Sequence, residues 1–233
     1  MKKRKVCYGI IVSLLIMALL SSRMRNFLVE FGYFFTSFIK NPATVGSVMP
    51  SSPALAEEII RYIDTKKRAV KILEVGAGTG VFTQEIAKKM GPDDHLDIIE
   101  IDPSLCAMLE VKFIEYKNIT VHCMSILDWH PPYVYDFIVS GLPFNAFKAD
   151  FVDEILKTYI TLIKPGGILS YFEYIVASDI KKLFLKGEEK RDYLKNLALT
   201  SQFIKDFFFD IDMVFLNIPP TYVYHLKIKK NGD

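Results

Sequence analysis

The chain has 233 residues, 51% of them hydrophobic, so it is long and apolar enough to bury one substantial core. Its net charge of +2 is unevenly spread, because residues 1–40 carry seven basic side chains against one acid and the other 193 residues therefore carry −4. A main part without strong positive charge or a basic aromatic module argues against a nucleic-acid-binding protein.

The three cysteines, Cys7, Cys106 and Cys123, are scattered along the chain without the spacing of metal ligands. Their odd number and wide separation argue for a reducing compartment. We therefore expect no metal site.

The first residues predict a membrane-binding segment. Lys2, Lys3, Arg4 and Lys5 precede an apolar run over residues 6–20, shorter than the roughly 20 residues that cross a bilayer as a helix. Three interpretations remain open: a retained membrane segment, a cleaved signal peptide and a buried core helix. If retained, so short a segment can lie in or dip into one leaflet.

A second helix is predicted over residues 26–40, where four phenylalanines recur at helical spacing. Aromatic amphipathic helices with flanking basic residues suit the surface of an anionic membrane. The alternative is a helix packed on the main domain.

Residues 41–52 are rich in Pro, Gly and Ser and predict a loop. Ser52 can cap, and Pro53 can begin, a helix that runs to about Tyr62. The loop is suited either to fold over a ligand or to act as a plain linker.

A hydrophobic strand over residues 72–75 then runs into Gly76, Gly78 and Gly80, with Glu74 just before them. Glycine accepts positive φ and has no side chain to obstruct a ligand, so a polar molecule can lie against this main chain. The third glycine comes one residue too early for a dinucleotide fingerprint, and no Gly-Lys-Ser/Thr follows as in a phosphate loop.

The next strand, over residues 95–101, contains Glu100 near its carboxyl end. Carboxylate oxygens accept hydrogen bonds, and an acid beside a glycine turn therefore suits a ribose diol.

The rest of the chain alternates between helices and strands. Helices are expected at 81–89, 104–116, 151–163 and 181–206, and strands at 119–123, 135–140, 168–175, 213–218 and 222–228, with a turn at 164–167. The predicted fold is α/β, a Rossmann-like, seven-stranded, mostly parallel sheet with helices on both faces. Residues 1–40 form the membrane-associated helices and residues 41–233 the main domain.

Ligands of such sheets bind beyond the carboxyl ends of the strands. This places four segments around one crevice: residues 74–80, Glu100, Ser125 and residues 140–144.

At these residues the chain resembles class I methyltransferases that depend on S-adenosyl-L-methionine (SAM). Residues 74–80 match the first motif of that family, and Glu100 matches its ribose-binding acid. The resemblance implies SAM as cofactor. The implied cofactor-binding residues are Glu74, Gly76, Ala77, Gly78, Gly80, Glu100, Ile101, Ser125, Ile126 and Ser140.

The segment Ser140-Gly141-Leu142-Pro143 occupies the place where such enzymes present the acceptor atom, and these four residues are the predicted acceptor-positioning residues. RNA adenine N6-dimethyltransferases carry a similar segment with Asn in place of Gly141. Bacterial phosphatidylethanolamine N-methyltransferases carry Ser-Gly-Leu-Pro, which this chain matches. The resemblance to them extends to residues 40–42, 46–56 and 217–220, and so covers most of residues 35–226.

Both families usually place Gly-Asp-Ala after the third strand, whereas this chain has Cys123-Met124-Ser125. The acid that would contact the adenine amino group is missing. The departure leaves weaker or altered cofactor binding, or lost activity, as open outcomes.

The resemblance implies N-methylation of an aminophospholipid, phosphatidylethanolamine towards phosphatidylcholine, at an anionic membrane surface without nucleic acid. SAM is made and used in the cytosol, so we expect the cytoplasmic face of a membrane. The alternatives are rRNA adenine N6-methylation, methylation of another small lipid or amine, and a SAM-fold membrane protein without activity.

Methylation requires a neutral amine, so a proton acceptor is needed. Glu173 is the first candidate, and Tyr171 and His225 are further candidates, each on its position in the sequence alone. Phe144, Tyr171 and Tyr174 are candidates for cation–π contacts with a methylated ammonium, although core packing is their ordinary role.

Overall fold

The computed structural model describes residues 51–175, 185–217 and 220–229. The chain divides into two units, residues 1–49 and 50–233, and the described residues all lie in the second. The predicted membrane-binding region and most of the loop before Ser52 lie outside the described residues and stay predictions. Of the helices that the structure describes, none has both the length and the apolar character needed to cross a bilayer.

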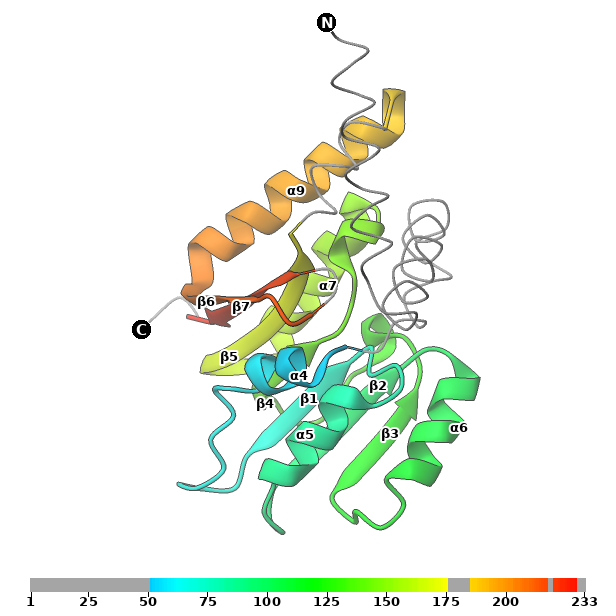
Figure 1. The fold of residues 1–233 in the computed structure, drawn as a ribbon, viewed down its shortest axis with the longest axis vertical. Coiled ribbons are helices and arrows are strands. Elements are labelled where there is room, and N and C mark those ends of the chain that lie inside the picture. Colours follow the sequence, from blue (N-terminus) through cyan, green and yellow to red (C-terminus); the bar gives the residue numbers. More distant parts are fainter. Residues whose placement is uncertain (1–50, 176–184, 218–219, 230–233) are drawn as a thin grey trace, which may run out of the picture. The chain divides into compact units, whose positions relative to one another are not determined.

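The described chain forms a seven-stranded sheet in the order β3-β2-β1-β4-β5-β7-β6 (Figure 1). Its strands are β1 (Lys71–Val75), β2 (His95–Glu100), β3 (Ile119–Cys123), β4 (Tyr135–Ser140), β5 (Ile163–Tyr174), β6 (Phe208–Val214) and β7 (Thr221–Lys227). All neighbours pair in parallel except β7, which is antiparallel to both β5 and β6. The predicted mostly parallel α/β sheet is confirmed.

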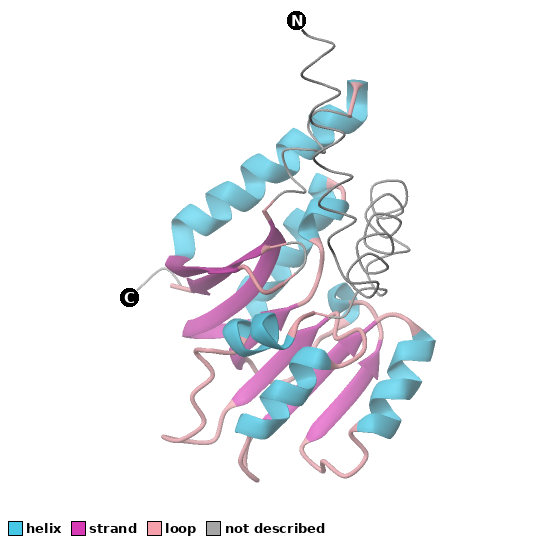
Figure 2. Cartoon of the chain, viewed as in Figure 1, coloured by secondary structure: helices cyan, strands magenta, loops and turns pink. Residues whose placement is uncertain are grey.

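Helices cover both faces of this sheet (Figure 2). They are α4 (Pro53–Ile59), α5 (Val81–Lys89), α6 (Pro103–Lys112), α7 (Ala149–Leu162) and α9 (Gly187–Phe207), with short 3₁₀ helices η1 (Ile126–Asp128) and η2 (Phe144–Ala146). One hydrophobic core joins α7 and α9 to the sheet, and a second joins α4, α5 and α6 to it.

Two helices begin with a side-chain cap, and the sequence predicted the first of them. Ser52 Oγ accepts a hydrogen bond from the Leu55 N–H (3.1 Å), and Pro53 follows as the first helical residue of α4. The Asp102 carboxylate likewise accepts from the Ser104 N–H (2.8 Å) at the start of α6. These caps fix both helices beside the carboxyl ends of the strands.

Two predicted boundaries near the carboxyl terminus are wrong. The expected turn at residues 164–167 lies inside β5. The Gly166 N–H donates to Ile228 O (2.7 Å), and the Ile228 N–H donates to Gly167 O (3.0 Å). These two hydrogen bonds hold residues 164–167 in the sheet, where the pairing of β5 with β4 shifts register. The strand expected at 213–218 is instead β6, which begins directly after α9 ends at Phe207.

Two of the three cysteines pair with each other, which the sequence did not predict. Cys106 in α6 and Cys123 at the end of β3 form a disulfide, with their Cα atoms 5.8 Å apart. Disulfides persist mainly in oxidising compartments, so the cysteine-based argument for a reducing compartment loses its basis. The bond lies beside the predicted ribose site, because Cys123 pairs with Glu100 across β2 and β3.

Candidate active site

The glycine loop, residues 76–80, follows β1 at the carboxyl edge of the sheet, and there is open space beside it. Gly76 and Gly78 have φ of 72° and 55°, values that favour glycine. A Cβ built on Gly78 would meet no atom within 4 Å, whereas one on Gly76 would meet Leu142 Cδ2 at 2.8 Å. The space over Gly78 can therefore take part of a ligand, and Gly76 packs against the acceptor-positioning segment.

Glu100 is buried at the end of β2 and fastens the glycine loop. Its Oε2 accepts from the Gly78 N–H (2.9 Å), and its Oε1 accepts from the N–H groups of Ile101 (2.8 Å) and Asp102 (3.1 Å). A carboxylate has about four acceptor positions, so these three bonds leave capacity for a ligand hydroxyl.

Glu74 is fully buried one residue before the loop. Its Oε2 accepts from Thr83 Oγ1 (2.6 Å), but its Oε1 has no hydrogen-bond partner among the described residues. Burial raises the pKa of Glu74 to about 7, against the smaller opposing effect of the Thr83 hydrogen bond. A buried acceptor without a donor is costly unless a bound molecule satisfies it.

These residues fit SAM. The free acceptor on Glu74 suits a ligand amino group, the remaining capacity of Glu100 suits a ribose hydroxyl, and the space over Gly78 admits the chain between them. Glu74, the glycine-loop main chain and Glu100 would thus hold the cofactor.

The predicted adenine-side residues lie next to Glu100. The Met124 N–H donates to Glu100 O (2.9 Å), and Ser125 Oγ then accepts from the Leu127 N–H (3.2 Å) to begin η1. Ile126 is buried in the core, whereas Ile101 is 70% exposed. Direct contact of Ile101, Ser125 and Ile126 with the cofactor stays a prediction.

The acceptor-positioning segment lies directly against the glycine loop. The Gly141 N–H donates to Val75 O (2.8 Å), and a Cβ on Gly141 would collide with the carbonyl oxygen of Gly76. Leu142 and Pro143 continue from there into η2. The backbone at residue 141 therefore admits only glycine.

The Ser140 side chain lies at the end of β4 and contacts two neighbouring segments. Its hydroxyl is fully buried and accepts a hydrogen bond from Tyr159 OH (2.9 Å) on α7. The same oxygen accepts from the Leu142 N–H (3.4 Å), so the side chain joins the end of β4 both to α7 and to the acceptor-positioning segment.

Asn196 is a positioning residue that the sequence did not predict. Its buried Nδ2 donates to Phe144 O (2.9 Å) and Phe147 O (2.8 Å), so α9 fixes the backbone that follows Pro143. No local pattern distinguishes this asparagine from the other polar residues of the helix.

Glu173 lies near the carboxyl end of β5 and is hydrogen-bonded to Tyr171. Burial raises the pKa of Glu173 to about 7, and the Tyr171 hydrogen bond acts in the opposite direction. Its Oε1 is buried without a hydrogen-bond partner in the described part of the chain. A carboxyl group with this pKa is suited to take a proton near neutral pH.

The predicted aromatic residues are only partly brought together. The Tyr171 ring lies 5.2 Å from that of Phe144 and stacks on Tyr224 at 5.3 Å, between ring centroids. Phe144 and Tyr171 are both buried in the core, which makes them packing residues here. Tyr174 points to the other face of β5, where its ring contacts Phe172 at 5.5 Å.

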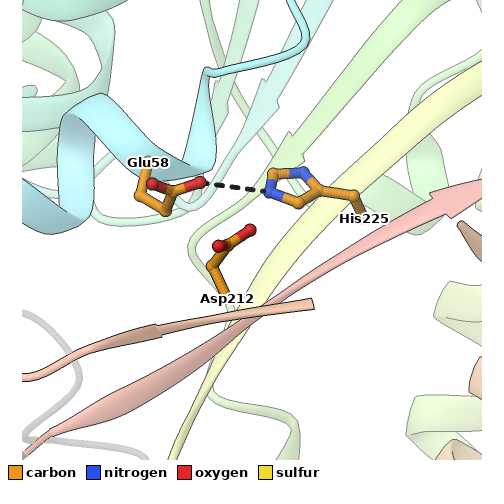
Figure 3. Close-up of side chains that lie close together, drawn as sticks. All are labelled: Glu58, Asp212 and His225. Atoms are coloured by element: carbon orange, nitrogen blue, oxygen red, sulfur yellow. Dashed lines mark ion pairs between the residues drawn. The ribbon is translucent and has the colours of Figure 1, made fainter. Parts of the chain in front are cut away.

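His225 does not join the predicted site either. It is fully buried on the α4 face of the sheet, with Nδ1 2.8 Å from Ser170 Oγ and Nε2 3.8 Å from Glu58 Oε1 (Figure 3). Burial lowers the pKa of His225 to about 4, so the ring is neutral at pH 7. Its place on this face separates it from Tyr171 and Glu173.

Glu58, Asp212 and His225 offer atoms within 4.8 Å of one another, a spacing that a metal ion could use (Figure 3). Arg61, however, already pairs with Glu58 (2.9 Å) and with Asp212. A cation would have to displace the guanidinium, and the cluster ties α4 to β6 as an ion-pair network.

Comparison with known proteins identifies the family. The family described as ribosomal RNA adenine dimethylase matches residues 42–166, more than half of the chain. The ornithine lipid N-methyltransferase of Singulisphaera acidiphila is 30% identical over 144 residues, which cover 59% of this chain and 74% of that protein. The ribosomal RNA small subunit methyltransferase A of Sulfurihydrogenibium is 28% identical over 196 residues, which cover 78% and 69%.

The chain spans only about half of the length of two other methyltransferases that it matches, 49% of one and 52% of the other. Among solved structures, the N-methyltransferase NodS of Bradyrhizobium japonicum in complex with S-adenosyl-L-homocysteine superposes with a TM-score of 0.54 at 16% identity, over 76% of this chain and 86% of that one. That likeness shows the fold. Together with the geometry of the glycine loop, Glu74 and Glu100, the family match means that the chain belongs to the ribosomal RNA adenine dimethylase family and is a SAM-dependent methyltransferase.

Proposed function

We propose that this enzyme methylates the amine of an aminophospholipid headgroup, phosphatidylethanolamine towards phosphatidylcholine, at the cytoplasmic face of an anionic membrane. The observation that carries the proposal is the contact of Gly141 with Gly76, because a side chain at this position would collide with the Gly76 carbonyl oxygen. RNA adenine N6-dimethyltransferases use an Asn there, and this backbone has no room for one. The relative that acts on ornithine lipid supports a lipid amine as acceptor.

SAM, when bound, supplies an electrophilic methyl group on a sulfonium. The residues of the chain have two tasks: to hold the acceptor nitrogen in line with that methyl group, and to remove its proton. Positioning of two reactants can supply most of such a rate enhancement. Gly141 and Leu142 contribute by holding the acceptor segment against the glycine loop.

Proton removal is needed because an aminoethyl headgroup with a lysine-like pKa of about 10.4 is neutral in only about 1 of 2,500 molecules at pH 7, a cost of roughly 4.6 kcal/mol. Burial of the amine disfavours its charged form and lowers this cost. Glu173 is the base in this proposal, because its pKa of about 7 leaves a substantial fraction ionised at neutral pH.

The deciding experiment incubates the purified enzyme with methyl-labelled SAM and either phosphatidylethanolamine vesicles or rRNA. Label is expected in the lipid only. The matched control is Gly78→Asp, which adds a strained, charged side chain to the space over the loop and should abolish incorporation.

The second candidate function is rRNA adenine N6-methylation. It is favoured by the family match and by the segment Leu142-Pro143-Phe144-Asn145, which is similar to that of the RNA enzymes. Label in rRNA and none in lipid would establish it and overturn the first proposal. Failure of SAM to bind in calorimetry would instead favour a protein without activity.

A further inference from the structure

The turn after β6 exposes two large apolar side chains. Phe215 is 70% exposed and Leu216 80% exposed, although turns usually carry small or polar residues. Isolated exposed apolar residues are common, but two adjacent ones at the end of a hairpin strand are typical of a surface that meets an apolar partner.

Strand directions place this turn at the active-site edge of the sheet. β6 is antiparallel to β7, which is antiparallel to β5, so β6 runs parallel to β5 and ends at the same edge (Figure 1). The register of β5, β7 and β6 shows how far the turn extends along this edge. Thr221 of β7 pairs with Tyr174 on one side and Val214 on the other, so Phe215 extends one residue beyond the row of Tyr174.

The first described residues lie beside the same turn. Residues 1–50 precede Ser51, and the N–H of the next residue, Ser52, donates to Asn217 Oδ1 (3.0 Å), directly after Leu216. Within those 50 residues, residues 1–40 carry a net charge of +6 and a long apolar run. The sequence that precedes Ser51 is thus basic and apolar, and it and the exposed pair are suited to the same partner, an anionic lipid surface.

We propose that Phe215 and Leu216 insert into the interface of the membrane that carries the substrate and hold the active-site edge against the lipid headgroups. This inference rests on the proposed lipid N-methylation. Apolar side chains at an interface bury their surface in the boundary between headgroups and acyl chains, so the pair adds affinity and also orients the crevice.

The test is the double variant Phe215→Ser/Leu216→Ser of the full chain. Its matched control is Val111→Ser/Ile114→Ser, which removes two equally exposed side chains (74% and 75%) from the end of α6 and the turn leading to the start of β3. Binding is measured by co-sedimentation with vesicles of phosphatidylethanolamine and phosphatidylglycerol. SAM calorimetry verifies that each variant is folded.

We expect the Phe215/Leu216 variant to bind vesicles at least about tenfold more weakly, and the control to bind like wild type. The variant should also lose methylation of vesicle lipid while retaining methylation of a short-chain, monomeric phosphatidylethanolamine. Unchanged vesicle affinity would overturn the inference and leave the proposed function standing.

The two failures are distinguishable. If the wild type methylates neither form of the lipid, the proposed function fails, and the sedimentation result alone still decides the role of the pair. If analytical ultracentrifugation instead shows a wild-type dimer that the double variant dissociates, the exposed pair is an interface between copies and the inference is wrong.

Discussion

Gly141 and Gly76 approach each other so closely that a Cβ on Gly141 would collide with the carbonyl oxygen of Gly76. The obstacle is backbone, which cannot rotate away as a flexible side chain can. The acceptor segment and the cofactor loop therefore have their relative position set at this contact.

Gly141→Ala should separate the two segments and reduce kcat at least a hundredfold, because a displacement of about 1 Å can have that effect on a reaction that depends on positioning. Steady-state kinetics with saturating SAM measure it. Gly91→Ala is the control, since a Cβ there meets only Asp94 Oδ2 at an ordinary 3.6 Å. Normal turnover by Gly141→Ala would show that this contact is unimportant for catalysis.

The raised pKa of Glu74 leads us to expect that the free energy of unfolding depends on pH. Its pKa is about 7 in the folded protein, above the ordinary 4.5, so folding favours the protonated form. The stabilisation from this group is complete below about pH 4.5 and is lost as the pH rises to about 7. A shift of this size corresponds to about 3 kcal/mol.

Glu74→Gln should remove that dependence. Compared with the variant, the wild type should lose up to about 3 kcal/mol of unfolding free energy between pH 4.5 and pH 8, measured by urea unfolding without SAM. Glu57→Gln on the exposed side of α4 should follow the wild type. Parallel curves for Glu74→Gln and wild type would contradict the raised pKa.

The sequence could predict the glycine loop because positive φ is a local requirement that glycine satisfies. The bounds of α5, β3 and β4 were predicted correctly, since α5 begins directly after Gly80 and the hydrophobic pattern of each strand stops at its ends. β6 was not, because the apolar run over residues 207–209 continues from helix into strand without a boundary signal.

The features that the sequence did not reveal depend on tertiary packing. Cys106 meets Cys123 only because α6 packs beside β3, and Asn196 reaches Phe144 across 52 residues. His225 looked equivalent to Glu173 in the sequence, but strand alternation and register put the two on opposite faces.

Asn196 should act on turnover through the backbone that it holds. Asn196→Ala leaves the carbonyls of Phe144 and Phe147 without this donor, and we expect a loss of about 2–3 kcal/mol in stability. Because Asn196 positions the backbone that follows Pro143, kcat should fall about tenfold or more while the Kd of SAM is unchanged. Leu194→Ala, exposed on the same helix, is the control. An equal loss of SAM affinity would indicate a general structural role.

The hydrogen bond between Tyr171 and Glu173 allows the proposed base to be tested through the pH dependence of kcat/KM. Because the carboxyl must be ionised to accept a proton, kcat/KM for the lipid should rise with pH through about 7, and Glu173→Gln should remove that rise and lower kcat about 10²- to 10³-fold. The Tyr171 hydrogen bond lowers the pKa of Glu173, so Tyr171→Phe should move the rise to higher pH and leave the plateau rate closer to that of the wild type. Glu188→Gln, at the start of α9, should leave the profile unchanged. A Tyr171→Phe profile that coincides with the wild-type profile would exclude Glu173 as the group that titrates in the reaction.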